Sequence, residues 1–248
     1  MANLALIVGS GFSFLNLEIV ARSQTKKPYG APSGPILTAA FGAHRVLCCA
    51  RHGETHALAP HEVNYRANLW ALHAHGARRC IALNAVGAIA PRFRPGDLAV
   101  PEQLIDYTWG RAATFGGDGN VVHVDVTQPF DGVLAGKLVA AIAACGYGVQ
   151  RGVYGVTQGP RLETAAEIDR LERDGCAMVG MTAMPEAALA RELYLDYAIC
   201  AIAVNYAAGR SPDSAAISKQ IELNLAVGMQ RAAGVLQRLI PELCTEAL

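Results

Sequence analysis

The chain of 248 residues is long enough for one α/β domain with a large core, and 52% of its residues are hydrophobic. Lys plus Arg and Asp plus Glu balance at 21 each, so no positive field indicates a nucleic-acid partner and a small-molecule ligand is expected. The N-terminus has no basic leader and no apolar stretch approaches the roughly 18 residues that span a bilayer, so neither secretion nor membrane insertion is expected.

Short apolar runs predict strands that are buried on both faces. In chain order they cover residues 4–8, 46–50, 80–84, 97–100, 152–157, 177–181 and 198–204. Helical patterns alternate with them at residues 63–74, 132–145, 164–174, 185–195 and 217–240. This alternation predicts one α/β domain over residues 1–248, with a central mixed, mostly parallel sheet flanked by helices. The segments 22–35 and 105–131 are expected to be irregular loops with a functional or subunit-contact role.

The seven cysteines lie mostly within apolar runs and show no CxxC spacing. This distribution is typical of reduced thiols in a protein core and does not resemble a disulfide framework or a metal site. We therefore expect a cytoplasmic protein.

Polar residues follow the first two strands, at the sheet edge where folds of this kind bind ligands. In VGSGFS (8–13), backbone N–H groups and the Ser10 hydroxyl can face an anion, although a tight turn is the simpler interpretation and a dinucleotide fingerprint would need a third glycine. In ARHGETH (50–56), Arg51 and His52 supply donors that suit phosphate oxygens. The alternative for this second motif is a solvated charged loop.

Three later strand ends carry further candidates. In LNAVGAI (83–89), Asn84 is followed by Ala85 and Gly87, which allow close approach of a ligand to the backbone. In GPRLETAAE (159–167), Glu163 precedes a helix, where a carboxylate is also favoured by the helix dipole alone. In VGMTAMPEAALARE (179–192), Thr182 is either a ligand or the cap of the following helix.

The stretch AVNYAAG (203–209) places Asn205 where the last strand leaves the sheet. Taken alone, Asn205 is best interpreted as a turn residue, because Asn tolerates left-handed backbone and bonds its own loop.

Several long motifs, in order, resemble the trimeric purine nucleoside phosphorylase and methylthioadenosine phosphorylase family over nearly the whole chain. They are RHGETHALAPHEVNYRAN, AVGAI with PGDL, IDYT, QGPRLETAAE and GMTAMPEAALARE. The resemblance is greatest to the bacterial branch that acts on S-methyl-5'-thioinosine. It implies a phosphate site made by Ser10, Arg51, His52, Asn84 with the Ala85 backbone, and Thr182.

The resemblance also implies how the nucleoside is held. Met181 is expected against the ribose, and Leu162 stands where the family usually has an aromatic residue beside the base. His123 resembles a residue that the family donates to a neighbouring subunit's pocket, which implies a homotrimer. The chain has no histidine after His123 to bind a 5'-hydroxyl, and the apolar residues from Ile217 to Leu223 favour a methylthio group instead.

Asn205 and Glu163 indicate which base is bound. Members of the family that act on 6-aminopurines carry Asp at the position of Asn205 and usually a second Asp at the position of Ala207. An amide at residue 205 can donate to O6 or N7 of a 6-oxopurine, while Glu163 accepts from its N1–H. We therefore expect phosphorolysis of S-methyl-5'-thioinosine to hypoxanthine and 5-methylthioribose 1-phosphate, with Asn205, Glu163 and His52 as catalytic residues.

Inorganic phosphate is the expected cosubstrate, and no metal or other cofactor is expected. Two enzymatic alternatives remain at this point: a methylthioadenosine phosphorylase and an inosine/guanosine phosphorylase. A nucleoside-binding regulatory protein is the alternative without catalysis, because a fold does not by itself determine function.

Overall fold

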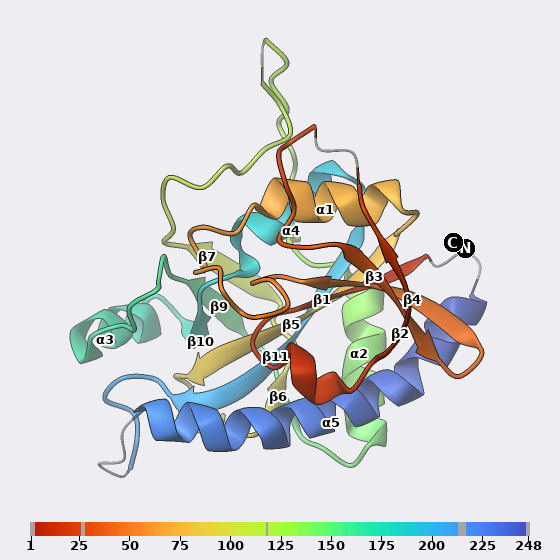
Figure 1. Cartoon of the computed structure of the whole chain (residues 1–248). Helices are drawn as coiled ribbons and strands as arrows, with labels where there is room; N and C mark the ends of the chain where they lie inside the picture. Colours follow the sequence, from red (N-terminus) through yellow and green to blue (C-terminus); the bar gives the residue numbers. More distant parts are fainter. Residues whose placement is uncertain (1–2, 26–27, 118, 213–216, 247–248) are drawn as a thin grey trace.

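The structure is a computed structural model that describes residues 3–25, 28–117, 119–212 and 217–246. Within these residues, eleven strands form one mixed sheet (Figure 1). The strand order is β2-β3-β4-β1-β5-β10-β9-β7, while β11 joins β5 to β6 and β6 pairs with β8. The strands are β1 (Leu4–Val8), β2 (Glu18–Ser23), β3 (Ile36–Phe41), β4 (His44–Ala50), β5 (Arg79–Ala88), β6 (Leu98–Ala99), β7 (Gln103–Asp106), β8 (Val149–Gln150), β9 (Val153–Val156), β10 (Cys176–Gly180) and β11 (Asp196–Tyr206).

The predicted mostly parallel sheet is confirmed. Parallel pairs link β1 with β4 and β5, β5 with β11, β9 with β10 and β7, and β6 with β8. Antiparallel pairs occur between β2, β3 and β4, between β5 and β10, and between β6 and β11. Each of the seven predicted strands is present, and β5 and β11 continue four and two residues beyond their predicted ends, to Ala88 and Tyr206.

Four strands were missed, and two lie in part within segments that were expected to be irregular. Arg22 and Ser23 belong to β2, and Ile105 and Asp106 belong to β7. Both strands are half-exposed and lie at the ends of the sheet order, so they lack the continuous apolar run that identifies a central strand.

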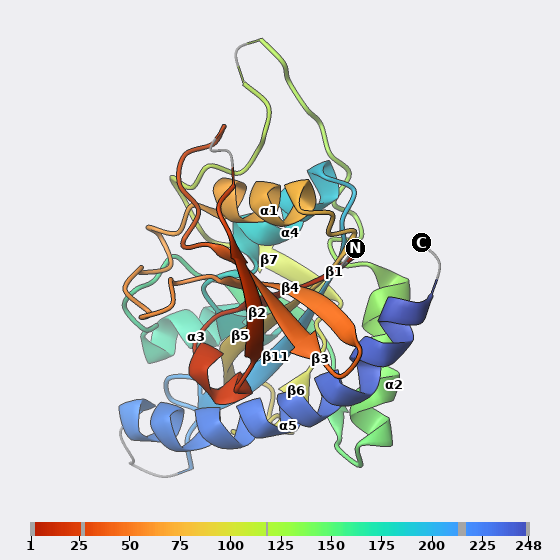
Figure 2. The same ribbon diagram turned by 45° about the vertical axis from the view of Figure 1, so that its right-hand side comes forward.

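Helices cover both faces of the sheet, in agreement with the predicted fold class. They are α1 (Tyr65–Ala74), α2 (Gly132–Ala144), α3 (Ala165–Arg173), α4 (Ala183–Glu192) and α5 (Ile217–Thr245), with a short 3-10 helix, η1 (Phe12–Leu15). Figures 1 and 2 show α1 and α4 on one face and α2 and α5 on the other. Leu69 and Leu189 belong to the first core, whereas Leu138 and Val235 belong to the second. Two cores explain why the central strands are apolar on both sides.

A notch in the sheet arises where β5 changes partner. One edge of β5 pairs with β1 as far as Leu83, and the same edge pairs with β10 at Gly87 and Ala88. Its other edge pairs with β11 over its whole length. Because β1 and β10 run towards each other, their carboxyl ends meet along β5 and leave the backbone at residues 84–86 open on that side.

The long connection after β7 leaves the body of the protein and returns to α2 (Figures 1 and 2). Its exposed apolar side chains include Trp109 and Val121, which are 73% and 75% accessible. The seven cysteines are free thiols, as expected, and most of them are buried. Among the described residues, no helix combines the length and the apolar character that crossing a membrane requires.

Candidate active site

A cavity of about 470 Å³ lies over the notch between β1, β5 and β10. Ten residues predicted for the site line this cavity: Ser10, Arg51, His52, Ala85, Gly87, Leu162, Glu163, Met181, Thr182 and Asn205. They come from the ends of β1, β4 and β10, from β5 and β11, and from the loop before α3. The structure therefore brings together side chains that lie up to 195 positions apart, from residue 10 to residue 205.

Arg51 is not part of a solvated loop, since it is only 1% exposed. Its Nε and Nη2 donate to the two carboxylate oxygens of Glu186 at 2.7 and 2.8 Å, and Nη2 and Nη1 also donate to Asn84 Oδ1 and the Leu83 carbonyl. These contacts use four of the five guanidinium N–H groups. The Nη1 atom also lies against the glycine loop, because a Cβ added to Gly9 would be 2.6 Å from it.

Glu186, on α4, is fully buried and also accepts a hydrogen bond from the Tyr197 hydroxyl at 2.8 Å. Burial opposes the charged form of Arg51, but the charge and hydrogen bonds of Glu186 outweigh it and raise the pKa of the guanidinium. The sequence analysis missed Glu186. A carboxylate within the apolar helix MPEAALA was the available signal, because a buried acid needs a partner.

Asn84 is not among the residues that line the cavity, and its side chain bonds two residues that do. Its Oδ1 accepts from Arg51, and its Nδ2 donates to Thr182 Oγ1 at 3.1 Å. Asn84 therefore positions Thr182, and the Thr182 oxygen is an acceptor for this bond while its proton remains available for the cavity. Thr182 occupies the N-cap position of α4 but makes no capping hydrogen bond, so the simple capping interpretation is wrong.

The glycine loop after β1 keeps Ser10 at the cavity. Gly9 N–H bonds the Leu83 carbonyl at 3.2 Å, which ties the loop to β5. Phe12, which follows the loop, packs against the second core and does not line the cavity. The loop therefore places Ser10 at the cavity wall, and its role in binding an anion stays a prediction.

His52 lies at the same end of the cavity and is 6% exposed. Its Nδ1 lies 2.8 Å from the Leu58 carbonyl oxygen. Burial, followed by the charge of Arg51, lowers the pKa of His52 to about 4. The imidazole is consequently neutral at neutral pH.

Asn205 and Glu163 lie at the other end of the cavity. Asn205 is 7% exposed and follows a β-bulge in β11, and its Nδ2 donates to the Tyr206 carbonyl at 2.6 Å. Its backbone is not left-handed and β11 continues through Tyr206, so the turn-residue interpretation is wrong. Gly87 makes room for this amide, because a Cβ there would lie 3.3 Å from Asn205 Nδ2.

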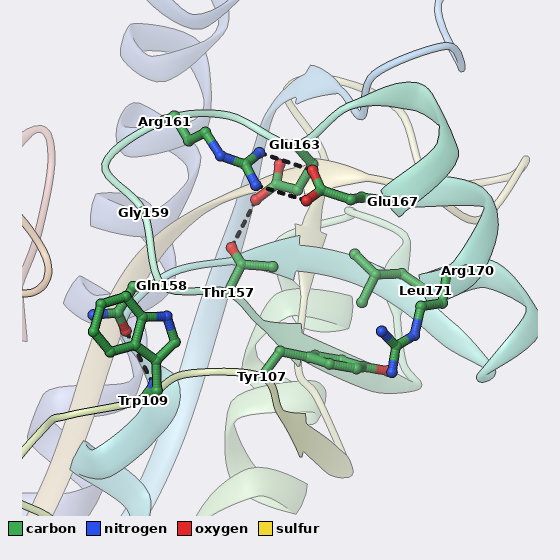
Figure 3. A pocket seen from close by; sticks show the side chains of 10 residues that line it. All are labelled: Tyr107, Trp109, Thr157, Gln158, Gly159, Arg161, Glu163, Glu167, Arg170 and Leu171. Carbon is green, nitrogen blue, oxygen red and sulfur yellow. Dashed lines mark hydrogen bonds and ion pairs between the residues drawn. The ribbon is translucent and has the colours of Figure 1, made fainter.

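Glu163 accepts a hydrogen bond from the Thr157 hydroxyl at 2.6 Å. It does not cap α3, since Thr164 and Glu167 form a capping box there. Glu163 also borders a second hollow of about 340 Å³, whose lining includes Tyr107, Trp109 and Arg161 (Figure 3). Figure 3 shows Arg161 paired with Glu167 in this hollow, so the positive charge of Arg161 is compensated by the Glu167 carboxylate.

Arg111, on the long connection, is a second residue that the sequence analysis missed. Its guanidinium donates to the carbonyls of Met181 and Met184 at 2.7 and 2.6 Å and to the Gln158 carbonyl at 2.8 Å. Arg111 thus holds together the two loops that border the cavity. Every residue has a main-chain carbonyl, so the sequence contains no pattern that predicts these hydrogen bonds, and only the structure shows this role of Arg111.

Two further predicted residues are not placed in the cavity. His123 is exposed on the long connection and does not line the cavity of its own chain. Ile217 begins α5, but its side chain lies outside the described residues. Within the predicted apolar segment, Ile221 does line the cavity, whereas Leu223 is 73% exposed and does not.

The comparisons with known proteins agree with this geometry. The family model described as Phosphorylase superfamily matches residues 3–241. The chain belongs to the phosphorylase superfamily. Among the superfamily's solved structures, methylthioadenosine phosphorylase from Schistosoma mansoni superposes with a TM-score of 0.92 at 29% identity, covering 100% of this chain and 93% of that one.

Two curated relatives in the phosphorylase superfamily are more similar in sequence. A probable S-methyl-5'-thioinosine phosphorylase from Pseudomonas syringae pv. tomato is 50% identical over 95% of this chain and 97% of its own length. A 6-oxopurine nucleoside phosphorylase from Pyrococcus furiosus is 41% identical over 90% of this chain and 86% of its own length. The superfamily membership and the polar strand ends that line the cavity together identify it as the candidate active site.

Proposed function

We propose that this protein catalyses the phosphorolysis of S-methyl-5'-thioinosine to hypoxanthine and 5-methylthioribose 1-phosphate. The observation that carries the proposal is the Asn205 amide at one end of the cavity, with Arg51, His52 and Thr182 at the other. The 50% identity to a probable S-methyl-5'-thioinosine phosphorylase supports the same assignment.

The base end fits a 6-oxopurine. The Tyr206 carbonyl only accepts, so the Asn205 atom beside it must be the nitrogen, which leaves a second N–H to donate to O6 or N7. Glu163 accepts a hydrogen bond from the Thr157 hydroxyl on one oxygen and keeps acceptor capacity for N1–H. The similarity to a 6-oxopurine nucleoside phosphorylase supports this pattern.

The sugar end fits an apolar 5'-substituent. Ile221 supplies an apolar side chain to the cavity from α5, and Met181 supplies another from just after the end of β10. A hydroxyl without a hydrogen-bond partner would be disfavoured against such a wall, whereas a methylthio group would not.

Residues at the two ends of the cavity have different roles in the proposed reaction. Thr182, Ser10 and the open backbone at Ala85 hold phosphate below the sugar, where it attacks C1' as the bond from C1' to N9 breaks. The electron pair of that bond moves into the purine, and the Asn205 amide stabilises the charge that develops there. Phosphate is the cosubstrate, and we propose that no metal or other cofactor takes part.

A substrate comparison tests the proposal. Release of free base is measured by absorbance with methylthioinosine, methylthioadenosine and inosine, with and without phosphate. We expect phosphate-dependent release and the largest kcat/KM with methylthioinosine. Preference for methylthioadenosine or inosine would favour the corresponding phosphorylase, and nucleoside binding without release of base would favour a regulatory protein.

We also propose that the protein is a cytoplasmic homotrimer in which His123 completes a neighbour's cavity. The exposure of His123 and Trp109 on the long connection supports this arrangement. Sedimentation equilibrium is expected to give the mass of three chains. Mixed trimers of a Thr182→Val chain and a His123→Ala chain are expected to be more active than either variant alone, and a fully active monomer would contradict the assembly.

A further inference from the structure

The hydrogen bond of His52 fixes its tautomer. A carbonyl oxygen can only accept, so the short contact of Nδ1 with the Leu58 carbonyl places a proton on Nδ1. Leu58 N–H also donates to the His52 carbonyl at 3.1 Å, so the loop is closed by both a backbone and a side-chain bond. The neutral ring consequently carries a lone pair, and no proton, on Nε2.

The Nε2 edge of the ring faces the glycine loop. A Cβ added to Gly9 would lie 3.8 Å from His52 Cδ2, the ring atom bonded to Nε2. No residue in the described part of the chain bonds Nε2, and His52 lines the cavity. The proposed phosphate site therefore contains one hydrogen-bond acceptor, His52 Nε2, in addition to the donors Ser10 and Thr182.

The surrounding charges do not favour protonation of Nε2. Arg51 lowers the pKa of His52, and His56, whose ring centroid is 4.6 Å away, acts in the same direction. Glu186 lies behind Arg51 and is paired with it, so this pair adds no net charge to the site. Of these groups, none presents a negative charge to the ring that would hold a second proton.

We propose that His52 makes the site selective for a tetrahedral oxyanion that carries its own proton. Hydrogen phosphate donates its P–OH to Nε2, while its unprotonated oxygens accept from Thr182 and Ser10 and remain available for attack. Sulfate has the same shape and charge but no proton at neutral pH, so one of its oxygens would face the Nε2 lone pair. This inference rests on the proposed role of phosphate as cosubstrate.

Calorimetric titration of the whole protein with inorganic phosphate and with sulfate tests the proposal. At mildly alkaline pH, we expect sulfate to bind roughly ten- to a hundredfold more weakly than phosphate. Sulfate binding is expected to strengthen as the pH falls, because it requires His52 to take up a proton. In two buffers of different ionisation enthalpy, phosphate binding should show no proton uptake.

Two variants sharpen the test. In His52→Gln, the amide can turn its N–H towards either anion, so the preference for phosphate is expected to shrink to a few-fold. His75→Gln is the matched control, because His75 Nδ1 also contacts a backbone carbonyl, Ala71 O, at 2.8 Å but lies outside the cavity. Its preference should equal that of the wild type.

Equal affinity for the two anions, or proton uptake with phosphate, would overturn the proposal even if the protein is a phosphorylase. Release of base that does not depend on phosphate would instead overturn the proposed function.

Discussion

Replacement of Glu186 by glutamine is expected to lower the free energy of unfolding by about 3–5 kcal/mol and to abolish most phosphorolysis. The substitution leaves the Arg51 charge in a fully buried position without its counter-charge. It also places an amide N–H against one of the three donors that now reach the Glu186 carboxylate. A displaced guanidinium no longer orients Asn84, and Thr182 loses its support.

A double-variant cycle separates the loss of stability from the loss of activity. In Arg51→Met combined with Glu186→Gln, neither charge remains, so we expect much of the stability to return while phosphorolysis stays lost. Urea unfolding and a base-release assay measure the two quantities. Glu102→Gln is the control, because the Glu102 pair with Arg151 is about half exposed and is worth at most about 1 kcal/mol. A stable and fully active Glu186→Gln protein would remove the buried pair from this account.

Replacement of Asn205 by aspartate is expected to lower activity on methylthioinosine relative to methylthioadenosine. The wild-type amide uses one N–H on the Tyr206 carbonyl and has one for the base. An ionised aspartate has no donor, and a protonated one would direct its only proton to the same carbonyl. Either form loses the donor to O6 or N7, which is worth about 2–4 kcal/mol, or roughly one and a half to three decades in rate.

The quantity to measure in this second experiment is the kcat/KM for methylthioinosine divided by the kcat/KM for methylthioadenosine. We expect it to fall by the stated factor in Asn205→Asp and to be unchanged in Asn16→Asp, an exposed control in a left-handed loop. An unchanged ratio in Asn205→Asp would mean that the amide only stabilises the end of β11.

The sequence predicted the residues at strand ends because each such residue adjoins a recognisable apolar run. Ser10, His52 and Thr182 were found in this way, and the sheet topology then brings them together. The sequence could not show what each side chain contacts. Arg51 pairs with Glu186, a residue 135 positions away, and Asn84 bonds both Arg51 and Thr182.

Two of the four missed strands have a different cause. The edge strands β2 and β7 are half-exposed, so their composition resembles that of loops. Arg111 was missed because its partners are main-chain carbonyls, which are identical in every residue.

The notch in the sheet gives the pocket a fixed length. Ala85 and Gly87 both line the pocket and are neighbours on one side of the same strand, about 7 Å apart, with Ala85 at the proposed phosphate end. Since β11 pairs with β5 throughout this region, the spacing is determined by the backbone repeat and cannot stretch to suit a longer ligand. In the proposed binding mode, the backbone of β5 therefore fixes the separation of phosphate and base, and substrates of this pocket are expected to differ only in the groups at its two ends.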